Sequence, residues 1–434
     1  MKGAAPLARA AACTALLLAG GSAAAETLEE AWQAALAVDR TLAAEERRTD
    51  AASAEHDAAR GARLPTVSVA AGVARWRDVP AFDFSAVGLP GELPLFGGRS
   101  MQTADARISL PIFSSGAIGS SIAAAEAALA AQQRTTGSTA QDLRMAVAER
   151  YIEVLRAQSA LVVAGASRTS LAAHTRDVDD MFQNGQVPKN DLLAASVTLA
   201  DAEQRRLKAG NALALANAAY NRRVGRPLGD RIALDPALPA VDPQLRSTTP
   251  ENLALLAWQH RDELAALDAA HAALLARSAA ARAEGRPQLA LSGNYTMLEN
   301  EFLNRDDFWS VGIALQWNLM DGGQSRNRAG AFAARAAAVE RERDELQSLV
   351  ELAVREAWLD VQESTQRIAV AEQAITQAGE NLRVVRDRYL QGEGTNTEVL
   401  DAEALATASR ANLDNARYDA ALAEFRLARA VGIL

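Results

Sequence analysis

The chain has 434 residues, a formal net charge of −9 and 23% charged residues. An acidic chain without a basic block argues against nucleic acid as a partner. The length alone suggests two or three domains. After the N-terminal segment, no stretch holds 18 consecutive strongly apolar residues, so membrane-spanning helices are not expected.

The N-terminal segment ending at Ala25 has the pattern of a secretory signal peptide. Lys2 and Arg9 are followed by an apolar stretch at 10–19, which is too short for the roughly 20 residues that a spanning helix needs. We therefore predict cleavage after Ala25. The sole cysteine, Cys13, leaves with this segment, so the mature chain has neither disulfides nor thiol chemistry.

The mature chain contains an internal duplication. Three pairs of segments share an offset of 207 residues: 109–116 with 316–323, 148–154 with 355–361, and 222–225 with 429–432. Upstream of Ser109 the offset widens to about 223. Similar residues that recur at one spacing over such a length indicate a repeated unit. We predict a first repeat at 26–225, a proline-rich connector at 226–249 that cannot be one continuous helix, and a second repeat at 250–434.

Each copy is predicted to contain a helix, two strands, a very long helix, a turn and a long helix. In the second copy, two rows recur every seven residues before the turn: Val354, Val361, Ile368, Ile375, Leu382 and Tyr389, and Ala357, Ser364, Ala371, Ala378 and Val385. Sustained heptads predict coiled-coil packing. The helix from about residue 322 to the turn would be roughly 100 Å long at 1.5 Å per residue. In the first copy, Arg168 and Thr175 interrupt the pattern.

The predicted strands at 288–298 and 309–319 alternate apolar residues with small or polar ones. Strands of about ten residues with this alternation are typical of transmembrane β-barrels, and the alternative is a soluble sandwich with an apolar core. Aromatic residues in or beside the strands are assigned to the membrane interfaces: Trp76, Phe113, Tyr295, Trp309 and Trp317. Four strands per chain cannot close a barrel, so this interpretation requires an oligomer.

The whole mature chain resembles the TolC-like outer-membrane efflux protein family. The residues that carry the resemblance are TLEEAWQAAL (27–36), Arg63-Leu64-Pro65, Arg286-Pro287, NLMDGG (318–323) and RYLQGEGTNTEVLDAE (388–403). The resemblance implies a mixed α and β fold: a long α-helical coiled-coil barrel, continuous with a transmembrane β-barrel and closed by trimerisation. It places the protein in the outer membrane of a Gram-negative bacterium, extending into the periplasm.

The resemblance also implies a function and partners. A homotrimer in outer-membrane lipid would be the passive exit duct of a tripartite efflux or type I secretion system, docked to a periplasmic adaptor and an inner-membrane pump. The alternative function is a soluble periplasmic coiled-coil scaffold or adaptor, and the aromatic-bounded strands argue against it. The four histidines have no ligand spacing. We therefore expect no catalytic site, no metal and no cofactor. We do not expect the protein to be an enzyme.

The two helix interruptions, at 182–194 and 389–401, are interpreted as the periplasmic tips of two coiled-coil hairpins. The predicted tip and adaptor-contact residues are Gly185, Gln186, Val187, Pro188, Gly392, Glu393, Gly394 and Thr395. Glycine permits the backbone reversal at each turn, and Pro188 suits the start of a helix.

The resemblance places two acidic residues, Glu398 and Asp401, at the tunnel entrance. In a trimer they would form a ring of six carboxylates that favours cations. The alternative is that both residues only stabilise the N-terminus of the helix.

A gate is also implied by the resemblance. Gly394 stands where relatives have an arginine, which argues against a salt-bridged gate. Asp191 and Tyr389 retain the acidic and aromatic positions, and Lys189 is a candidate for the missing cation.

Overall fold

The computed structural model describes residues 25–83, 88, 92–94, 98–299 and 304–434. The predicted signal peptide therefore lies outside the described residues, apart from Ala25. The chain divides into two compact units. Unit 1 comprises Met1–Ala43, Thr139–Arg261 and Leu349–Leu434, and unit 2 comprises Ala44–Ser138 and Asp262–Ser348. Each unit takes segments from both predicted sequence repeats.

The helices recur at the spacings that the duplication predicts. Their bounds are α1 (Leu28–Val38), α2 (Arg40–Gly61), α3 (Ala117–Gln183), α4 (Lys189–Arg223), α5 (Gln244–Ser247), α6 (Pro250–His260), α7 (Asp262–Glu284), α8 (Gln324–Leu390) and α9 (Asn396–Val431). Both α3 and α8 have 67 residues, and their bounds are offset by 207. The starts of α1 and α6 are offset by 222, as are those of α2 and α7. Among the described helices, none is long and apolar enough to cross a membrane.

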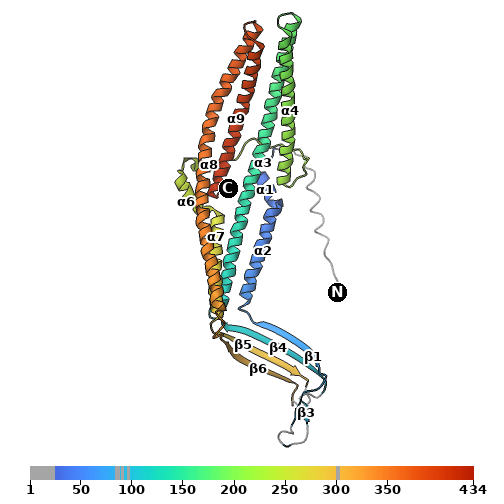
Figure 1. Ribbon diagram of the computed structural model, residues 1–434, viewed down its shortest axis with the longest axis vertical. Helices are drawn as coiled ribbons and strands as arrows, with labels where there is room; N and C mark the ends of the chain where they lie inside the picture. Colours follow the sequence, from blue (N-terminus) through green and yellow to red (C-terminus); the bar gives the residue numbers. More distant parts are fainter. Residues whose placement is uncertain (1–24, 84–87, 89–91, 95–97, 300–303) are drawn as a thin grey trace, which may run out of the picture. The chain divides into compact units, whose positions relative to one another are not determined.

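The long helices of unit 1 form two hairpins, α3 with α4 and α8 with α9 (Figure 1). The heptad positions face their interior: Val354, Val361 and Val399 are buried, and so are the small residues Ala357 and Ala378 of the companion row. Small side chains on one row allow close approach of the partner helix. The predicted coiled-coil packing is confirmed.

The N-terminal helix α1 is fixed against the core of unit 1 by its cap. The backbone amide of Thr27 donates to Glu30 Oε2 (2.8 Å), and the amide of Glu30 donates to Thr27 Oγ1 (3.3 Å). This capping box satisfies two amides that the first turn leaves unpaired. It starts the helix so that Leu28, Ala31 and Ala35 point into the core.

An aromatic pair joins the core of unit 1 to the connector. The ring of Tyr151 from α3 lies 6.0 Å from that of Tyr220 from α4, edge to face. The Tyr151 hydroxyl lies within hydrogen-bond distance of two backbone carbonyls, Glu26 O (2.6 Å) and Asp235 O (2.7 Å). The Tyr151 hydroxyl therefore attaches both Glu26, next to the predicted cleavage site, and Asp235 of the connector to α3.

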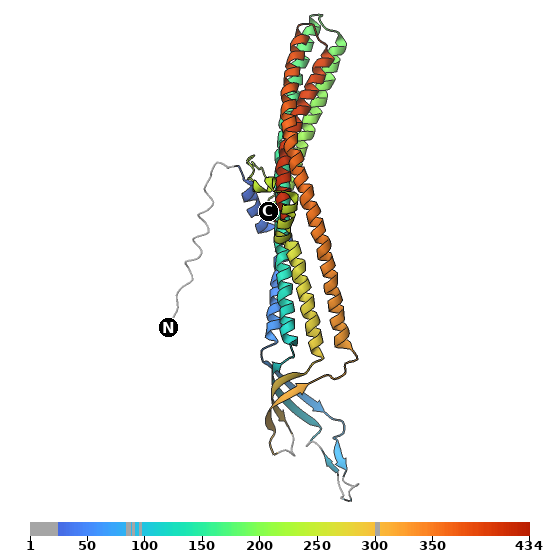
Figure 2. The same cartoon turned by 90° about the vertical axis from the view of Figure 1, so that its left-hand side faces the viewer.

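Unit 2 contains the predicted strands. Four of them form an antiparallel sheet in the order β1-β4-β5-β6, with β1 (Thr66–Arg75), β4 (Ser100–Phe113), β5 (Gln288–Leu298) and β6 (Asp307–Gln316) (Figure 2). A short ribbon pairs β2 (Ala81–Asp83) with β3 (Glu92–Pro94). Within the described chain, β1 and β6 each have one edge without a partner strand.

The strand β6 ends at Gln316, three residues before the predicted end. The Asp321 carboxylate accepts hydrogen bonds from the backbone amides of Gly323 and Ser325, both at 2.9 Å. These bonds form the cap of α8 and turn the chain before it enters the helix. The chain therefore turns at the predicted corner, 318–323. The strand before it ends earlier than the alternation of side chains suggested.

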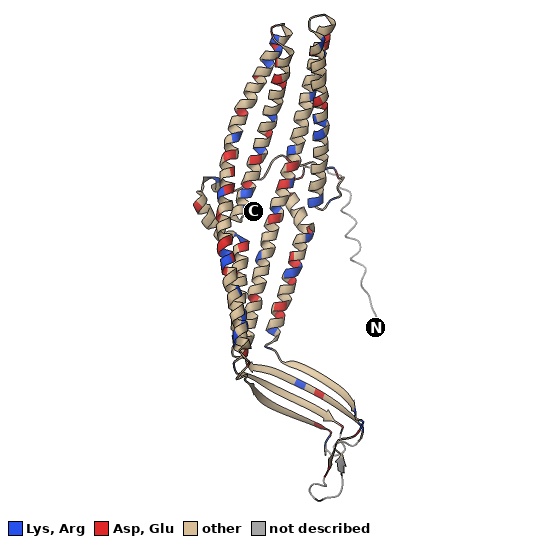
Figure 3. Ribbon diagram, in the orientation of Figure 1, with Lys and Arg blue, Asp and Glu red and all other residues tan. Residues whose placement is uncertain are grey.

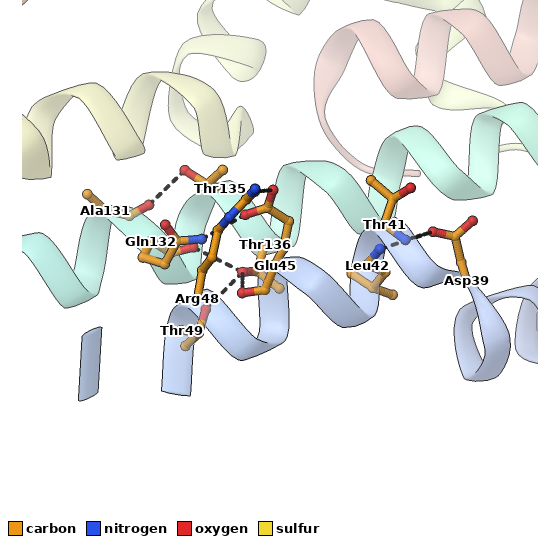
Figure 4. Close-up of polar contacts among 10 residues, drawn as sticks. All are labelled: Asp39, Thr41, Leu42, Glu45, Arg48, Thr49, Ala131, Gln132, Thr135 and Thr136. Carbon is orange, nitrogen blue, oxygen red and sulfur yellow. Dashed lines mark hydrogen bonds and ion pairs between the residues drawn. The ribbon is translucent and has the colours of Figure 1, made fainter. Parts of the chain in front are cut away.

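Polar contacts attach α2 to α3 within unit 2 (Figure 4). Leu42 is the buried residue of α2, and it belongs to unit 1. Beyond it, Gln132 Nε2 donates to Glu45 Oε2 (2.9 Å), and the hydroxyls of Thr49 and Thr136 lie 2.9 Å apart. The predicted coiled-coil type of contact does not extend to this helix pair, because α2 carries no apolar stripe on its later turns.

We predict that Tyr151 makes the stability of the protein sensitive to alkaline pH. Burial of the Tyr151 hydroxyl, with a smaller effect of the Asp235 carboxylate, raises its pKa to about 12. A phenol in the unfolded chain titrates near 10, so this stabilisation is complete below pH 10 and is lost as the pH rises to about 12. The free energy of unfolding should fall by about 2 to 3 kcal/mol over this range from this group.

The matched variant is Tyr151→Phe, which cannot ionise. Its unfolding by urea, followed by circular dichroism in detergent, should show a smaller alkaline loss than the wild type. The variant should be less stable near neutral pH by about 1 kcal/mol because the hydroxyl bonds are absent. Parallel pH profiles of the two proteins would contradict the assignment.

Candidate functional site

The turns that end α3 and α8 have the same backbone geometry. The N–H of Gly185 donates to Phe182 O (2.9 Å), and that of Gln186 donates to Met181 O (2.8 Å). This is a Schellman motif, which requires a left-handed residue at its centre. Gly185 has φ of 72°, and Gly392 repeats the conformation in the second turn with φ of 76°. Both predicted turn glycines therefore have the backbone role that the sequence assigned to them.

The helices after the two turns start differently. At α4, Pro188 occupies the N-cap position without a side-chain hydrogen bond. At α9, Thr395 and Glu398 form a capping box: the Thr395 amide donates to Glu398 Oε2 (3.0 Å), and the Glu398 amide donates to Thr395 Oγ1 (3.3 Å). Glu398 thus caps the helix while its side chain stays exposed. Asp401 is also exposed and has no ion pair with any residue that the structure describes.

Gly394 is enclosed by the second turn. A Cβ atom at this position would lie 3.2 Å from Tyr389 N and 3.2 Å from Glu398 Oε2. Any larger side chain would crowd the capping box, because the backbone nitrogen cannot move without disturbing the end of α8. The local geometry therefore favours glycine over arginine at this position.

Tyr389 is buried between the two hairpins, with 4% of its surface exposed. It packs with Val178 and Val399, and its ring lies 5.4 Å from the ring of His174. Its hydroxyl has no hydrogen-bond partner among the described residues. Burial, and to a lesser degree the charge of Asp191, raises the pKa of Tyr389. The side chain acts here through packing and not through a hydrogen bond to Asp191.

Asn396, the first residue of α9, connects that helix to the other hairpin. His174 Nε2 of α3 donates to Asn396 Oδ1 (2.7 Å), and both side chains are buried. Asn396 Nδ2 donates to the backbone carbonyl of Asp191 in the first turn of α4 (3.1 Å). Because a buried amide must find partners, this arrangement fixes the start of α9 relative to both α3 and α4.

A buried carboxylate lies farther along the same helix. Glu403 of α9 has 4% of its side chain exposed and is paired with Arg386 Nη2 of α8. Ser170 Oγ of α3 donates to Glu403 Oε1 (2.8 Å) and accepts from Arg386 Nη2 (2.6 Å). The charge is compensated by a guanidinium and a hydroxyl from two different helices, as a buried carboxylate requires.

Two hydrogen-bonded sets lie between the hairpins, and we call them together the tip cluster: Ser170, Arg386 and Glu403, and His174 with Asn396. It was not predicted from the sequence. One signal was available, because Glu403 lies four residues after the buried Val399. This spacing places its carboxylate beside the apolar row, on the same side of the helix, where a buried charge needs a partner.

The other predicted site residues lie around this cluster. Asn396 binds the backbone carbonyl of Asp191, and its partner His174 packs against Tyr389. Lys189 is exposed and forms no ion pair with the part of the chain that the structure describes. In the turns, Gln186, Gly392 and Glu393 are exposed. Their roles in a gate or in adaptor contact stay predictions.

One face of the sheet in unit 2 is apolar and exposed. Its largest residues are Val67, Val69, Val73, Ile108, Tyr295, Trp309, Val311, Ile313 and Leu315. Val69 and Trp309, with 75% and 74% of their surfaces exposed, lie in the same row across the sheet. A water-soluble protein rarely exposes so large an apolar patch. No described segment covers it as the core of a soluble sandwich would be covered, which favours lipid as its environment.

The five predicted interface aromatics lie in or next to these strands and are exposed in the single chain. Tyr295 and Trp309 are direct cross-strand partners. Trp76 follows β1, and Trp317 follows β6. Their assignment to the two surfaces of the membrane stays a prediction.

Comparison with known proteins decides the family. The family described as outer membrane efflux protein matches residues 31–226 and 253–433. The chain belongs to this family. The matched residues lie in both predicted repeats, and the interval between them, 227–252, overlaps the predicted connector at 226–249.

Relatives of the outer membrane efflux protein family match at moderate identity. The outer membrane protein TolC of Vibrio cholerae is 27% identical over 316 residues, which cover 68% of this chain and 69% of TolC. The outer membrane efflux protein BepC of Brucella suis is 34% identical over 157 residues, which span 36% of this chain and 34% of BepC. Among solved structures, VceC of Vibrio cholerae has a TM-score of 0.80 at 18% identity, covering 93% of this chain and 96% of VceC.

These matches confirm the predicted family, the mixed α and β fold and the outer-membrane location. The family description and the names of the relatives agree with the predicted role of an efflux duct.

We predict that breaking the tip cluster loosens the hairpins of this family member. Arg386→Met leaves the buried Glu403 carboxylate with only the Ser170 hydroxyl, and an unpaired buried charge is strongly unfavourable. The free energy of local opening around α9 should fall by about 2 to 3 kcal/mol. Hydrogen exchange measured by mass spectrometry at residues 396–410 would report this loss.

The matched control is Arg383→Met in the same helix. Arg383 forms exposed ion pairs with Glu380 and Asp387, so its loss should change the opening free energy much less than the loss of Arg386 does. The double variant Arg386→Met with Glu403→Met should recover much of the protection. Equal effects of the two arginine variants would refute a special role for the buried pair.

Proposed function

We propose that three copies of this chain form the exit duct of a tripartite efflux or type I secretion system. The observation that carries the proposal is the sheet of unit 2, which combines an exposed apolar face with two unpaired edges. Lipid does not tolerate such edges, and closure into a barrel removes them. Four strands from each of three chains give a barrel of twelve, within the known range for outer-membrane barrels.

The paired turns of unit 1 support a role as the periplasmic entrance. Each chain supplies two hairpins with the same Schellman geometry, so a trimer presents six similar turns to a partner. The proposed adaptor contacts are the turn residues Gly185 to Pro188 and Gly392 to Thr395. The partners would be a periplasmic adaptor and an inner-membrane pump, with outer-membrane lipid around the barrel.

Glu398 and Asp401 are proposed as the acidic ring of this entrance. The capping role of Glu398 is compatible with the ring, because one oxygen accepts the Thr395 amide while the side chain remains exposed. Tyr389 and Asp191 are proposed as gate residues. Lys189 is exposed and is proposed to reach an acidic group of a neighbouring copy.

The duct is proposed to do no chemistry. Solutes would move passively, with energy supplied by the inner-membrane pump, and the pump would select the cargo. No group of three or more His, Cys, Asp or Glu residues within the described residues could hold a metal ion. The residues of the tip cluster are engaged with each other, as a structural role requires.

The decisive experiment is the mass of the mature protein extracted from outer membranes, measured by light scattering in detergent. We expect a species of about three chains that aggregates when detergent is removed, since the apolar face is then exposed to water. A soluble monomer or dimer that needs no detergent would refute the duct. It would favour a periplasmic scaffold instead.

We predict that the acidic ring binds multivalent cations. In planar bilayers, Glu398→Gln with Asp401→Asn should weaken block of the channel by hexaamminecobalt(III) about tenfold or more, because six charges are removed from one constriction. Glutamine preserves the capping box, so the turn should stay folded. The control Asp201→Asn removes an exposed acid that is paired with Arg205 on α4 and should leave the block unchanged.

A further inference from the structure

The face of the sheet opposite the apolar one carries small and polar residues. On β4 and β5 it includes Thr103, Asp105, Arg107, Ser109, Ser292, Asn294 and Thr296. Across β1, β4, β5 and β6, Asp105 and Arg107 are the two charged residues of this face within the described strands. In Figure 3 the body of the sheet is tan apart from one red and one blue segment.

Both side chains are held by hydrogen bonds across the β4–β5 pair. Arg107 Nε donates to Asn294 Oδ1 (2.8 Å), and Thr296 Oγ1 donates to Asp105 Oδ1 (2.9 Å). In each case the partner is the directly paired residue of β5. The two charged residues are exposed and form no ion pair with each other or with any other described residue. Their charges are therefore fixed in position and available to solutes.

The pair lies away from the edges at which chains would join. β4 and β5 are the two inner strands of the sheet, whereas β1 and β6 are the outer ones. Closure of a barrel from several copies would use β1 and β6. Substitution of Asp105 or Arg107 therefore leaves the joining strands unchanged, so that an effect on conduction can be separated from an effect on assembly.

We propose that Arg107 and Asp105 form two adjacent charged rings on the wall of the barrel lumen and that these rings select permeating solutes by charge. The inference rests on the proposed trimeric duct. With the apolar face toward lipid, the polar face lines the lumen. Three guanidinium groups form a transient site for anionic groups of a solute, and three carboxylates form one for cationic groups.

The dimensions allow the guanidinium ring to act across the whole lumen. A twelve-stranded barrel with strands about 4.8 Å apart and tilted by about 40° has a backbone radius of about 12 Å. An arginine side chain extends roughly half this distance toward the axis. The remaining distance is shorter than the Debye length of about 8 Å at physiological salt. A solute on the axis therefore experiences the guanidinium charge, whereas the shorter Asp105 side chains lie about one Debye length from the axis and act mainly on solutes closer to the wall.

The order of the rings follows from the direction of β4. This strand runs from Ser100 to Phe113 and leads into α3, so Arg107 lies closer to the helix than Asp105 does. A solute that enters from the helices meets the guanidinium ring first. Because the two rings have opposite charge, the intact lumen has little net charge, and neutralising either ring alone unbalances it.

The test measures the ratio of potassium to chloride permeability from reversal potentials in planar bilayers. All variants are made on the Glu398→Gln, Asp401→Asn background so that the proposed acidic ring contributes no charge. Arg107→Gln should raise the ratio and Asp105→Asn should lower it, each by about two- to fivefold. Arg107→Lys retains the charge and should keep the background ratio.

A second readout does not depend on the stability of these variants. The only cysteine of the chain, Cys13, lies in the predicted signal peptide, so an introduced cysteine is labelled selectively. A water-soluble sulfonate-bearing methanethiosulfonate should react with Arg107→Cys and increase cation preference further. Ile108→Cys, on the apolar face of the same strand, should not respond, because lipid covers it.

The outcomes separate this inference from the proposed duct. If the wild type conducts ions but both neutralised variants keep the background permeability ratio, the charged rings are refuted and the duct stands. Labelling of Ile108→Cys in place of Arg107→Cys would also overturn the inference, because the faces would be reversed. A wild type that forms no conducting channel would overturn both.

Discussion

The backbone edges of a four-stranded sheet are the constraint on which the rest of the structure depends. β1 and β6 each present a row of unpaired amides and carbonyls, next to a face made of residues such as Val69, Trp309 and Ile313. In lipid each unsatisfied group costs several kcal/mol, so the sheet is stable there only if further strands complete it. The sequence repeat explains how they can. β4 ends the strand pair of the first copy, β5 begins that of the second, and their pairing joins copy to copy. Pairing of β6 with β1 of another chain would repeat the same relation.

Much of the fold could be predicted because its signals are periodic and local. The heptad rows at Val354 and Ala357 set the helical packing, and the 207-residue offset set the matching bounds of α3 and α8. The turn glycines and the capping role of Glu398 follow from single positions in the sequence. The early end of β6 could not be predicted in this way. The alternation of apolar and polar side chains continues through Trp317, and only the hydrogen bonds to Asp321 interrupt it.

The tip cluster could not be derived in the same way. His174 and Asn396 are 222 residues apart, and their contact depends on how one hairpin is aligned along the other. Glu403 alone gave a local signal, since it lies four residues after the buried Val399 on the same side of α9. Arg386 and Ser170 resemble ordinary surface residues of a helix until the alignment of α3, α8 and α9 is known.

The polar residues of the tip cluster fix the alignment of these helices. Rows of alanine, valine and leucine repeat every seven residues, so a hairpin shifted by one heptad would bury similar apolar surface. The shift would carry Glu403 away from Arg386 and Ser170 and leave a buried charge without compensation, which is strongly unfavourable. Polar residues in a coiled coil commonly fix register in this manner, with some loss of stability. Here they also fix the position of Asn396, and therefore of the turn at Gly392, relative to α3 and α4. An entrance built from several hairpins needs its turns at one level, and a core of apolar heptads alone does not specify that level.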